Sequence, residues 1–351
     1  MTKHFIRPRL SKIGLRRLVK TTNITIAFLA IALFTLPNIV MGMELTRDQE
    51  IRKFSQYMQL RHKLDAKKVL RVLQNTKLET QALKILSHTP EQKVTWLEYK
   101  KRFINRQHIN QGKKFITKHQ EVLQRAYQEY GVPPEIITSI IGVETNYGQL
   151  YGTYRTINIL TTIGFSEYRR AEFFRGELEE FLLLAEHQQK DPFDYVSSYA
   201  GAMGYGQFLP SSYRNYGIDF DRDGKVDLTS SLSDAIGSVA NYLHAFGWEK
   251  DELVILEAET REDARIDKVK FNASLKPNIS IRKLITRYGL IPQVSKDYKV
   301  WRSKDKVTPL KFVGEEPELW LGRNNYYVLS RYNPSHKYVM ALFLLSRALI
   351  N

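Results

Sequence analysis

The sequence predicts an α+β protein that is mainly α-helical and carries a small β-containing insert. From Thr46 to about Glu129, and again in several later segments, apolar residues recur three and four positions apart with charged residues between them, which is the helical period. Runs typical of strands are confined to the C-terminal part of the chain. The 351 residues include no cysteine, so the stability of the fold must come from its apolar core.

The predicted helices follow one another through most of the chain. Residues 43–100 are expected to form an N-terminal helical domain, and residues 51–64 and 65–74 have its clearest pattern. Pro133-Pro134 and Gly148 mark the start and the end of a later helix. The other expected helices lie at residues 115–130, 166–189, 234–246, 281–288 and 335–350.

The insert at residues 252–325 is predicted to contain its own sheet. Residues 253–257 and 307–313 have strand-like patterns inside it, and residues 326–331 have one directly after it. Residues 197–217 are rich in Gly, Ser and Tyr and show little periodicity, so they are expected to form a loop. Sites concentrate in loops that a rigid scaffold holds in place.

The N-terminal segment, residues 1–42, has the features of a secretory signal peptide. Its first 22 residues carry seven Lys or Arg and no acid, and an apolar run from Ile24 to Val40 follows them. The run ends at Val40-Met41-Gly42, with small residues where a signal peptidase cleaves, and it is short and interrupted for a membrane span. An uncleaved anchor is the alternative. Either way we expect an exported, periplasmic protein, and without cysteine it is not a lipoprotein.

The net charge of +16 is concentrated in part in this leader. Without the leader, 46 Lys and Arg remain against 37 Asp and Glu. No long basic run and no basic patch interleaved with aromatic residues is present, so a nucleic-acid partner is not expected. The modest surplus suits an anionic polymer, but it is equally a solubility feature.

Glu144 lies where an apolar helix face should continue. Ile137, Ile140 and Ile141 share one face of the predicted helix, and Glu144 is the next residue on it. Burial of a carboxyl group disfavours its charged form, which is what a general acid requires. The alternative is a glutamate paired with a buried arginine, or a helix end that turns toward solvent.

A second candidate is the glycine-rich segment from Ser197 to Tyr213. Three glycines within six residues permit close approach of the backbone to a ligand. Ser198 and Gln207 offer neutral donors and acceptors, whereas Tyr205 and Phe208 offer flat apolar faces. Binding of a sugar ring requires both polar partners for its hydroxyl groups and a flat apolar face for the ring. The alternative is a tight loop whose glycines serve packing alone.

A third candidate is an acidic loop that begins at Asp219. Asp219, Asp221 and Asp223 alternate before Gly224, as in the first half of a calcium loop, and Lys225 can offer its backbone carbonyl. The twelfth position should be a bidentate glutamate but is Ser230, so Asp234 is the candidate for the missing carboxylate. The alternative is a solvated acidic turn that caps a helix.

Several of these segments occur in a fixed order along the chain. The matching segments, in this order, are Gly142–Gly148, Arg169-Arg170 before Ala171-Glu172, the loop 200–213, the acidic loop with Asp234–Tyr242, and Arg331-Tyr332-Asn333-Pro334-Ser335. In this order they resemble the lytic murein transglycosylase B family of bacterial cell-wall enzymes. The resemblance extends from about residue 95 to the C-terminus. It implies a lysozyme-like catalytic core at residues 101–251, a β-containing domain at 252–325, and a segment 326–351 that returns to the core.

The resemblance also implies a function and a set of site residues. The family cleaves the bond between N-acetylmuramic acid and N-acetylglucosamine without water, because the muramyl 6-hydroxyl attacks its own C1 and leaves a 1,6-anhydro end. Glu144 matches the catalytic acid. The positions that match the sugar groove are Arg169, Arg170, Ser198, Gln207, Phe208, Tyr332, Asn333 and Tyr338. Those that match the calcium loop of residues 219–234 are Asp219, Asp221, Asp223, Lys225 and Asp234.

Two departures from the family are visible. The family loop is one residue shorter before its final Asp, so the sequence leaves open which acid supplies the last ligand of this loop. Related enzymes are often anchored to a membrane through a lipid-modified cysteine, which this chain lacks.

The expected metal is calcium, and no organic cofactor is expected. Peptidoglycan glycan strands are the expected substrate. The protein is expected to be a monomer, with other cell-wall enzymes as further partners. Two alternatives to transglycosylation remain at this point. A hydrolytic muramidase of similar fold would use water, although most such enzymes use two carboxylates and no second acid lies in a comparable motif near Glu144. A non-catalytic, calcium-stabilised wall-binding protein would have no need to bury an acid.

Overall fold

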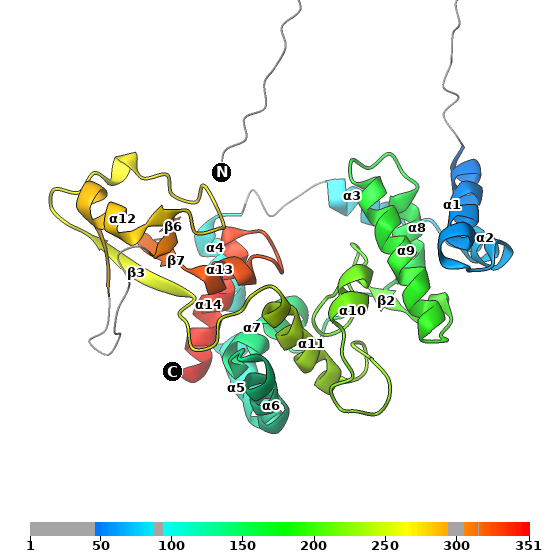
Figure 1. The fold of residues 1–351 in the computed structure, drawn as a ribbon, viewed down its shortest axis with the longest axis horizontal. Coiled ribbons are helices and arrows are strands. Elements are labelled where there is room, and N and C mark those ends of the chain that lie inside the picture. Colours follow the sequence, from blue (N-terminus) through cyan, green and yellow to red (C-terminus); the bar gives the residue numbers. More distant parts are fainter. Residues whose placement is uncertain (1–45, 88–93, 294–304, 315) are drawn as a thin grey trace, which may run out of the picture. The chain divides into compact units, whose positions relative to one another are not determined.

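The computed structural model describes residues 46–87, 94–293, 305–314 and 316–351 (Figure 1). The predicted signal peptide lies outside the described residues. Leu45–Asn351 form one compact unit. Within the described ranges, no helix combines the length and the apolar character needed to span a bilayer.

Helices make up most of the described chain, as the sequence predicted. In chain order they are α1 Arg47–His62, α2 Ala66–Gln74, α3 Thr80–Ser87, α4 Trp96–Phe103, α5 Arg106–Lys118, α6 Gln120–Tyr130, α7 Pro134–Thr145, α8 Thr156–Gly164, α9 Ala171–His187, α10 Pro210–Tyr216, α11 Leu232–Ala245, α12 Ile281–Tyr288, α13 Asn324–Leu329 and α14 His336–Ile350.

The strands of the described residues form two sheets. They are β1 Tyr154–Arg155, β2 Val196–Ser197, β3 Ile255–Thr260, β4 Ile279–Ser280, β5 Leu290–Pro292, β6 Lys306–Val313 and β7 Pro317–Gly322. β1 and β2 pair with each other, and the other five form an antiparallel sheet in the order β4-β6-β7-β3-β5. All five lie in the predicted insert, where α12 and this sheet enclose a small core of their own that includes Leu284, Val307 and Leu321.

The main core is shared by helices that are far apart in the sequence. α7 packs against α14, α5 and α6, and α11 packs against α6 and α7. In Figure 1, the C-terminal helix α14 lies beside α7, against which it packs. The first three helices instead contact α8 and α9: α3 packs on α8, and the side chains of α1 bond to α9. The predicted boundaries at residues 100 and 251 stay predictions.

Four local predictions need correction. Residues 326–331 were expected to form a strand, but the end of α13 and the turn after it occupy them. Residues 115–130 were expected to form one helix, but the chain breaks at His119, which ends α5 and precedes α6. The loop 197–217 contains α10, because Pro210 supplies a first helical residue. The strand expected at 253–257 begins two residues later, and β7 had not been predicted.

Candidate active site and calcium loop

Glu144 is the penultimate residue of α7 and is half-buried. Ile137, Ile140 and Ile141 are fully buried, so the apolar face predicted from the sequence packs into the core up to the turn that carries the carboxylate. The acid therefore lies at the boundary between the core and solvent. This is the position from which a carboxyl group can reach a polymeric substrate.

The turn after Glu144 is held in a left-handed conformation. Asn146, Tyr147 and Gly148 have φ values of 49°, 59° and 83°. The buried Thr145 hydroxyl lies 3.0 Å from the carbonyl oxygens of Ile141 and Tyr205, and it accepts a hydrogen bond from the Gly148 N–H at 3.0 Å. A Cβ at Gly148 would come within 2.5 Å of the Tyr205 ring. The end of α7 is therefore fixed to the glycine-rich loop.

Two tyrosines from the C-terminal segment complete the surroundings of Glu144. The Tyr338 hydroxyl donates a hydrogen bond to Glu144 Oε1 at 2.5 Å, and the Tyr332 hydroxyl donates to the Gly206 carbonyl at 2.6 Å. Burial, and then the nearby charge of Glu144, raise the pKa of both tyrosines well above the ordinary value, so both remain neutral donors. Three segments distant in sequence thus meet at Glu144.

The glycine-rich loop is closed by a pair of backbone hydrogen bonds between Met203 and Phe208, each 2.9 Å long. Gly204 has a φ of 68°, and a Cβ there would lie 2.1 Å from the Leu228 carbonyl oxygen, so only glycine fits. The Gln207 amide donates to the Gly204 carbonyl at 3.1 Å, and Ser198 Oγ accepts from the Ala202 N–H at 3.2 Å. Both polar side chains are half-buried.

Phe208 differs from the sequence expectation. Its side chain is only 3% exposed and packs edge-to-face on Tyr332, so it supports the loop from the core and offers no free face for stacking. Tyr205 is half-buried and meets Tyr151 edge-to-face at 5.0 Å. Of the two aromatic residues that the sequence offered as stacking faces, Tyr205 is therefore the accessible one.

Arg169 and Arg170 lie in the exposed turn before α9, where the Arg170 guanidinium stacks on the Phe173 ring at 4.3 Å. Asn333 precedes α14, and its carbonyl accepts from the Ser335 N–H at 2.8 Å. The roles of these three residues as sugar-groove positions stay predictions.

Sequence reasoning missed Thr145 and Tyr151. The hydroxyl bonds of Thr145 connect α7 with Tyr205, which is 60 residues away in the chain. Its place directly after Glu144 and before the left-handed turn at Asn146 was an available signal. For Tyr151 we find no local signal.

The acidic loop between α10 and α11 brings three carboxylates together. Oxygen atoms of Asp219, Asp221 and Asp223 all lie within 4.8 Å of one another. The Gly224 N–H donates to Asp219 at 2.8 Å, and Gly224 has a φ of 89°, which gives the sharp turn. Three convergent carboxylates are hard oxygen ligands of the type that calcium prefers, so the donor set fits this ion. The Lys225 N–H donates to Asp223 Oδ1, and its carbonyl as a ligand stays a prediction.

Asp234 has a different place from the one expected. It is 1% exposed and does not belong to the group of three. Its Oδ1 accepts from the N–H groups of Phe220 and Asp221 at 2.8 and 3.2 Å, and its Oδ2 accepts from the Asp227 N–H at 2.8 Å. With both oxygens bonded to the loop backbone, Asp234 holds the loop on the start of α11, and its role as a calcium ligand stays a prediction.

Comparison with known proteins agrees with this arrangement. Residues 46–347 match the family model described as transglycosylase SLT domain. The chain is 37% identical over 318 residues to the membrane-bound lytic murein transglycosylase B of Escherichia coli (strain K12), which covers 88% of this chain and 84% of that protein. The fold is similar to soluble lytic transglycosylase SltB1 from Pseudomonas aeruginosa, with a TM-score of 0.79, 40% identity, and coverage of 86% of this chain and 98% of that one.

A calcium complex is among the similar structures. The Escherichia coli lytic transglycosylase Slt35 in complex with calcium has a TM-score of 0.76 and 38% identity, and the match covers 86% of this chain and 92% of that one. Matches of this extent and identity, with the same helical architecture and small sheet, establish the family. The chain belongs to the transglycosylase SLT domain family, and it is a peptidoglycan lytic transglycosylase with a lysozyme-like core.

Proposed function

We propose that this protein cleaves the β-1,4 bond between N-acetylmuramic acid and N-acetylglucosamine, with Glu144 as its one acid and base. The observation that carries this proposal is the position of Glu144 at the meeting point of α7, the glycine-rich loop and α14, where the Tyr338 hydroxyl donates to its carboxyl group at 2.5 Å. A neutral hydroxyl donor of this kind orients the carboxyl group at the place where these three segments meet.

The reaction has two half-steps. Protonated Glu144 gives its proton to the glycosidic oxygen as the bond from that oxygen to muramyl C1 breaks, and an oxocarbenium-like sugar forms. Neutral groups and the N-acetyl group of the substrate stabilise this charge. The Glu144 carboxylate then takes the proton of the muramyl 6-hydroxyl as its oxygen bonds to C1. The products are a 1,6-anhydromuramyl end and a free 4-hydroxyl, and Glu144 returns to its protonated form.

Ser198, Gln207, Tyr332 and Asn333 are the residues we assign to holding the muramyl ring, with Arg169 and Arg170 farther along the groove. The Ser198 hydroxyl and the Gln207 amide are half-buried, and they lie on a loop that hydrogen bonds attach to α7. Because an internal nucleophile on a well-held ring reaches effective molarities of about 10⁵–10⁸ M, a rigid grip favours the 6-hydroxyl over water.

The test of the acid role is Glu144→Gln, which keeps the size of the side chain but has no proton to transfer. We expect sacculus cleavage to fall by about 10⁴-fold or more, because one group serves both half-steps, whereas binding to sacculi persists. Glu135→Gln is the matched control, since Glu135 is also half-buried and lies at the other end of α7. More than a tenth of wild-type activity in Glu144→Gln would remove Glu144 from this role.

We further propose that Asp219, Asp221 and Asp223 bind a structural calcium ion. The convergence of their carboxylates supports this, as does the calcium complex of Slt35. Bound there, the ion would neutralise the repulsion among the three acids. It takes no part in the chemistry in this proposal.

The proposed location is the periplasm, where peptidoglycan is accessible. The basic and apolar leader supports export, and the name of the Escherichia coli relative associates that protein with a membrane. Glycan strands are the proposed partner, and the protein is proposed to act as a monomer.

A further inference from the structure

A groove between α1 and α9 has features of a ligand site that catalysis does not explain. Two matching helical faces form it. Glu50, Lys53, Phe54 and Tyr57 come from α1, and Glu172, Arg175, Gly176 and Glu179 come from α9. Its volume of about 440 Å³ lies in the range of small-ligand pockets. None of its residues belongs to the sugar groove or the calcium loop.

Gly176 is the first independent sign of a ligand. It lies in the interior of α9, where glycine is the least favourable residue other than proline. A Cβ at this position would meet no atom within 4 Å, and the backbone φ is not positive, so neither packing nor conformation requires glycine. The glycine leaves the surface of the groove open at this position.

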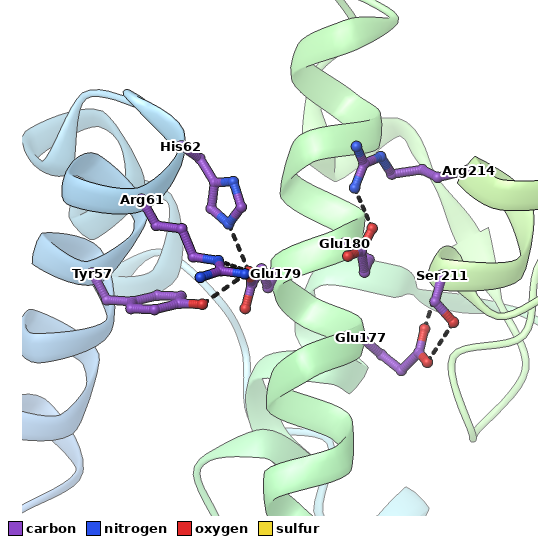
Figure 2. Close-up of polar contacts among 8 residues, drawn as sticks. All are labelled: Tyr57, Arg61, His62, Glu177, Glu179, Glu180, Ser211 and Arg214. Atoms are coloured by element: carbon purple, nitrogen blue, oxygen red, sulfur yellow. Dashed lines mark hydrogen bonds and ion pairs between the residues drawn. The ribbon is translucent and has the colours of Figure 1, made fainter. Parts of the chain in front are cut away.

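The charges in the groove are the second sign. Figure 2 shows that Glu179 is occupied: it accepts from the Tyr57 hydroxyl at 3.1 Å and contacts His62 Nε2 at 2.6 Å. Arg175 is also occupied, because its Nε donates to the Gly164 carbonyl at 3.1 Å and its guanidinium lies 5.0 Å from the Phe165 ring centre. These contacts fix the two walls.

Lys53 and Glu172 are different. Both side chains are exposed at the groove, and neither forms an ion pair or hydrogen bond with any residue that the structure describes. One free cation and one free anion thus face a groove whose apolar wall consists of Phe54 and the 40% exposed Tyr57. A neutral sugar has no charge to match them, whereas a short peptide with a carboxylate and an ammonium group has both.

We propose that this groove binds the peptide stems of peptidoglycan, an inference that rests on the function proposed above. Lys53 faces a stem carboxylate, Glu172 faces a stem ammonium group, and the peptide backbone passes over Gly176. Binding of a stem here adds a second point of attachment to strands that carry peptides, apart from the sugar groove that holds the scissile bond.

Direct binding tests the site. The probe is a synthetic L,D-stem tetrapeptide with a free side-chain ammonium group and a C-terminal carboxylate, titrated by calorimetry into the Glu144→Gln protein. We expect Gly176→Leu and Lys53→Glu each to weaken binding about tenfold, as expected when one contact of typical strength is lost. Lys67→Glu, an exposed lysine on α2 outside the groove, is the matched control and should bind as the parent does.

Folding is controlled in the same series. Leucine and alanine are good helix formers, so Gly176→Leu and Gly176→Ala should keep or raise the melting temperature. A variant that is more stable but binds less tightly is what a glycine kept for a ligand predicts. No binding to the parent protein, no effect of Gly176→Leu, or equal weakening by Lys67→Glu would each overturn the proposal.

Catalysis on two substrates separates this inference from the proposed function. Glycan strands with their stems are compared with strands from which an amidase has removed them. Gly176→Leu should raise KM about tenfold on strands with stems, with kcat unchanged, and should leave KM on bare strands as in the wild type. Equal effects on both substrates would overturn the stem site while leaving cleavage itself intact. If the wild type cleaves neither substrate, the proposed function fails instead.

Discussion

Tyr338 places a neutral hydroxyl donor 2.5 Å from Glu144 Oε1, an oxygen of the carboxyl group near the end of α7. An arginine at the same place would hold the carboxylate in its charged form and work against proton donation. A tyrosine whose pKa is raised by burial keeps its proton, so in the proposed mechanism Tyr338 orients the carboxyl group through both half-steps.

Removal of that donor gives a prediction at the same scale. Tyr338→Phe should lower kcat about 10- to 100-fold with little change in KM, because hydrogen bonds to charged groups contribute about 1.5–3 kcal/mol. Initial rates of release of soluble fragments from sacculi measure this. Tyr332→Phe is the matched comparison: its hydroxyl bonds to the Gly206 carbonyl, a neutral acceptor, so its loss should be smaller. A larger loss for Tyr332→Phe would contradict the assignment of Tyr338.

At the scale of elements, α9 forms side-chain contacts with α1 and with α10. Glu179 bonds to Tyr57 and His62 of α1, whereas Glu177 and Glu180 bond to Ser211 and Arg214 of α10 (Figure 2). α10 directly follows the glycine-rich loop, so its position determines where that loop leaves the core.

Glu177 predicts a dependence of stability on pH. It is 5% exposed, and burial raises its pKa above the ordinary 4.5, although the hydrogen bonds from Ser211 lower it. Because the folded-state pKa exceeds the unfolded one, its contribution to stability is complete below about 4.5 and is lost as pH rises to the folded-state value. The melting temperature of Glu177→Gln, relative to the wild type, should therefore be higher near pH 7 than near pH 4. A difference that does not change with pH, or that falls, would contradict this.

The calcium loop gives a second prediction for an element. Calcium should raise the melting temperature of the wild type. At a hundredfold excess over Kd, the free energy of unfolding should increase by about 2.7 kcal/mol, and Asp223→Ala should abolish that gain. Asp234→Asn is the informative comparison: Asp234 holds the loop backbone, so this change should destabilise the protein with and without calcium. If chelator and calcium leave the wild-type melting temperature unchanged, the loop is an acidic turn and nothing more.

For the molecule as a whole, signals that are local in the sequence predicted the fold well. α12 has the predicted bounds, because Ser280 caps its first turn and Gly289, with a φ of 67°, ends it. The prediction of a strand at residues 326–331 was wrong for a reason that is not local. Its aromatic and branched residues favour a strand, but the buried Asn325 amide bonds to Glu249 and Glu252, more than 70 residues away, and holds the segment as α13.

The site shows the same limit. The face that carries Glu144 and the alternating acids of the loop followed from spacing alone. The contact between Glu144 and Tyr338 spans 194 positions and was not predicted, since the resemblance to a family gave Tyr338 only as a sugar-groove position. The burial of Phe208 and the bracing role of Asp234 could not be predicted, because each depends on which atoms other elements bring to that position.

The central claim is that a single acid and a tethered hydroxyl cleave the strand without water, and the identity of the new chain end tests it most directly. Sacculi digested with the wild-type protein would be treated with borohydride, and the released fragments analysed by mass spectrometry. We predict 1,6-anhydromuramyl ends, which resist reduction and are lighter than the reduced hydrolytic product by one water and two hydrogens. Fragments that end mainly in reduced muramic acid would show attack by water and would contradict the account.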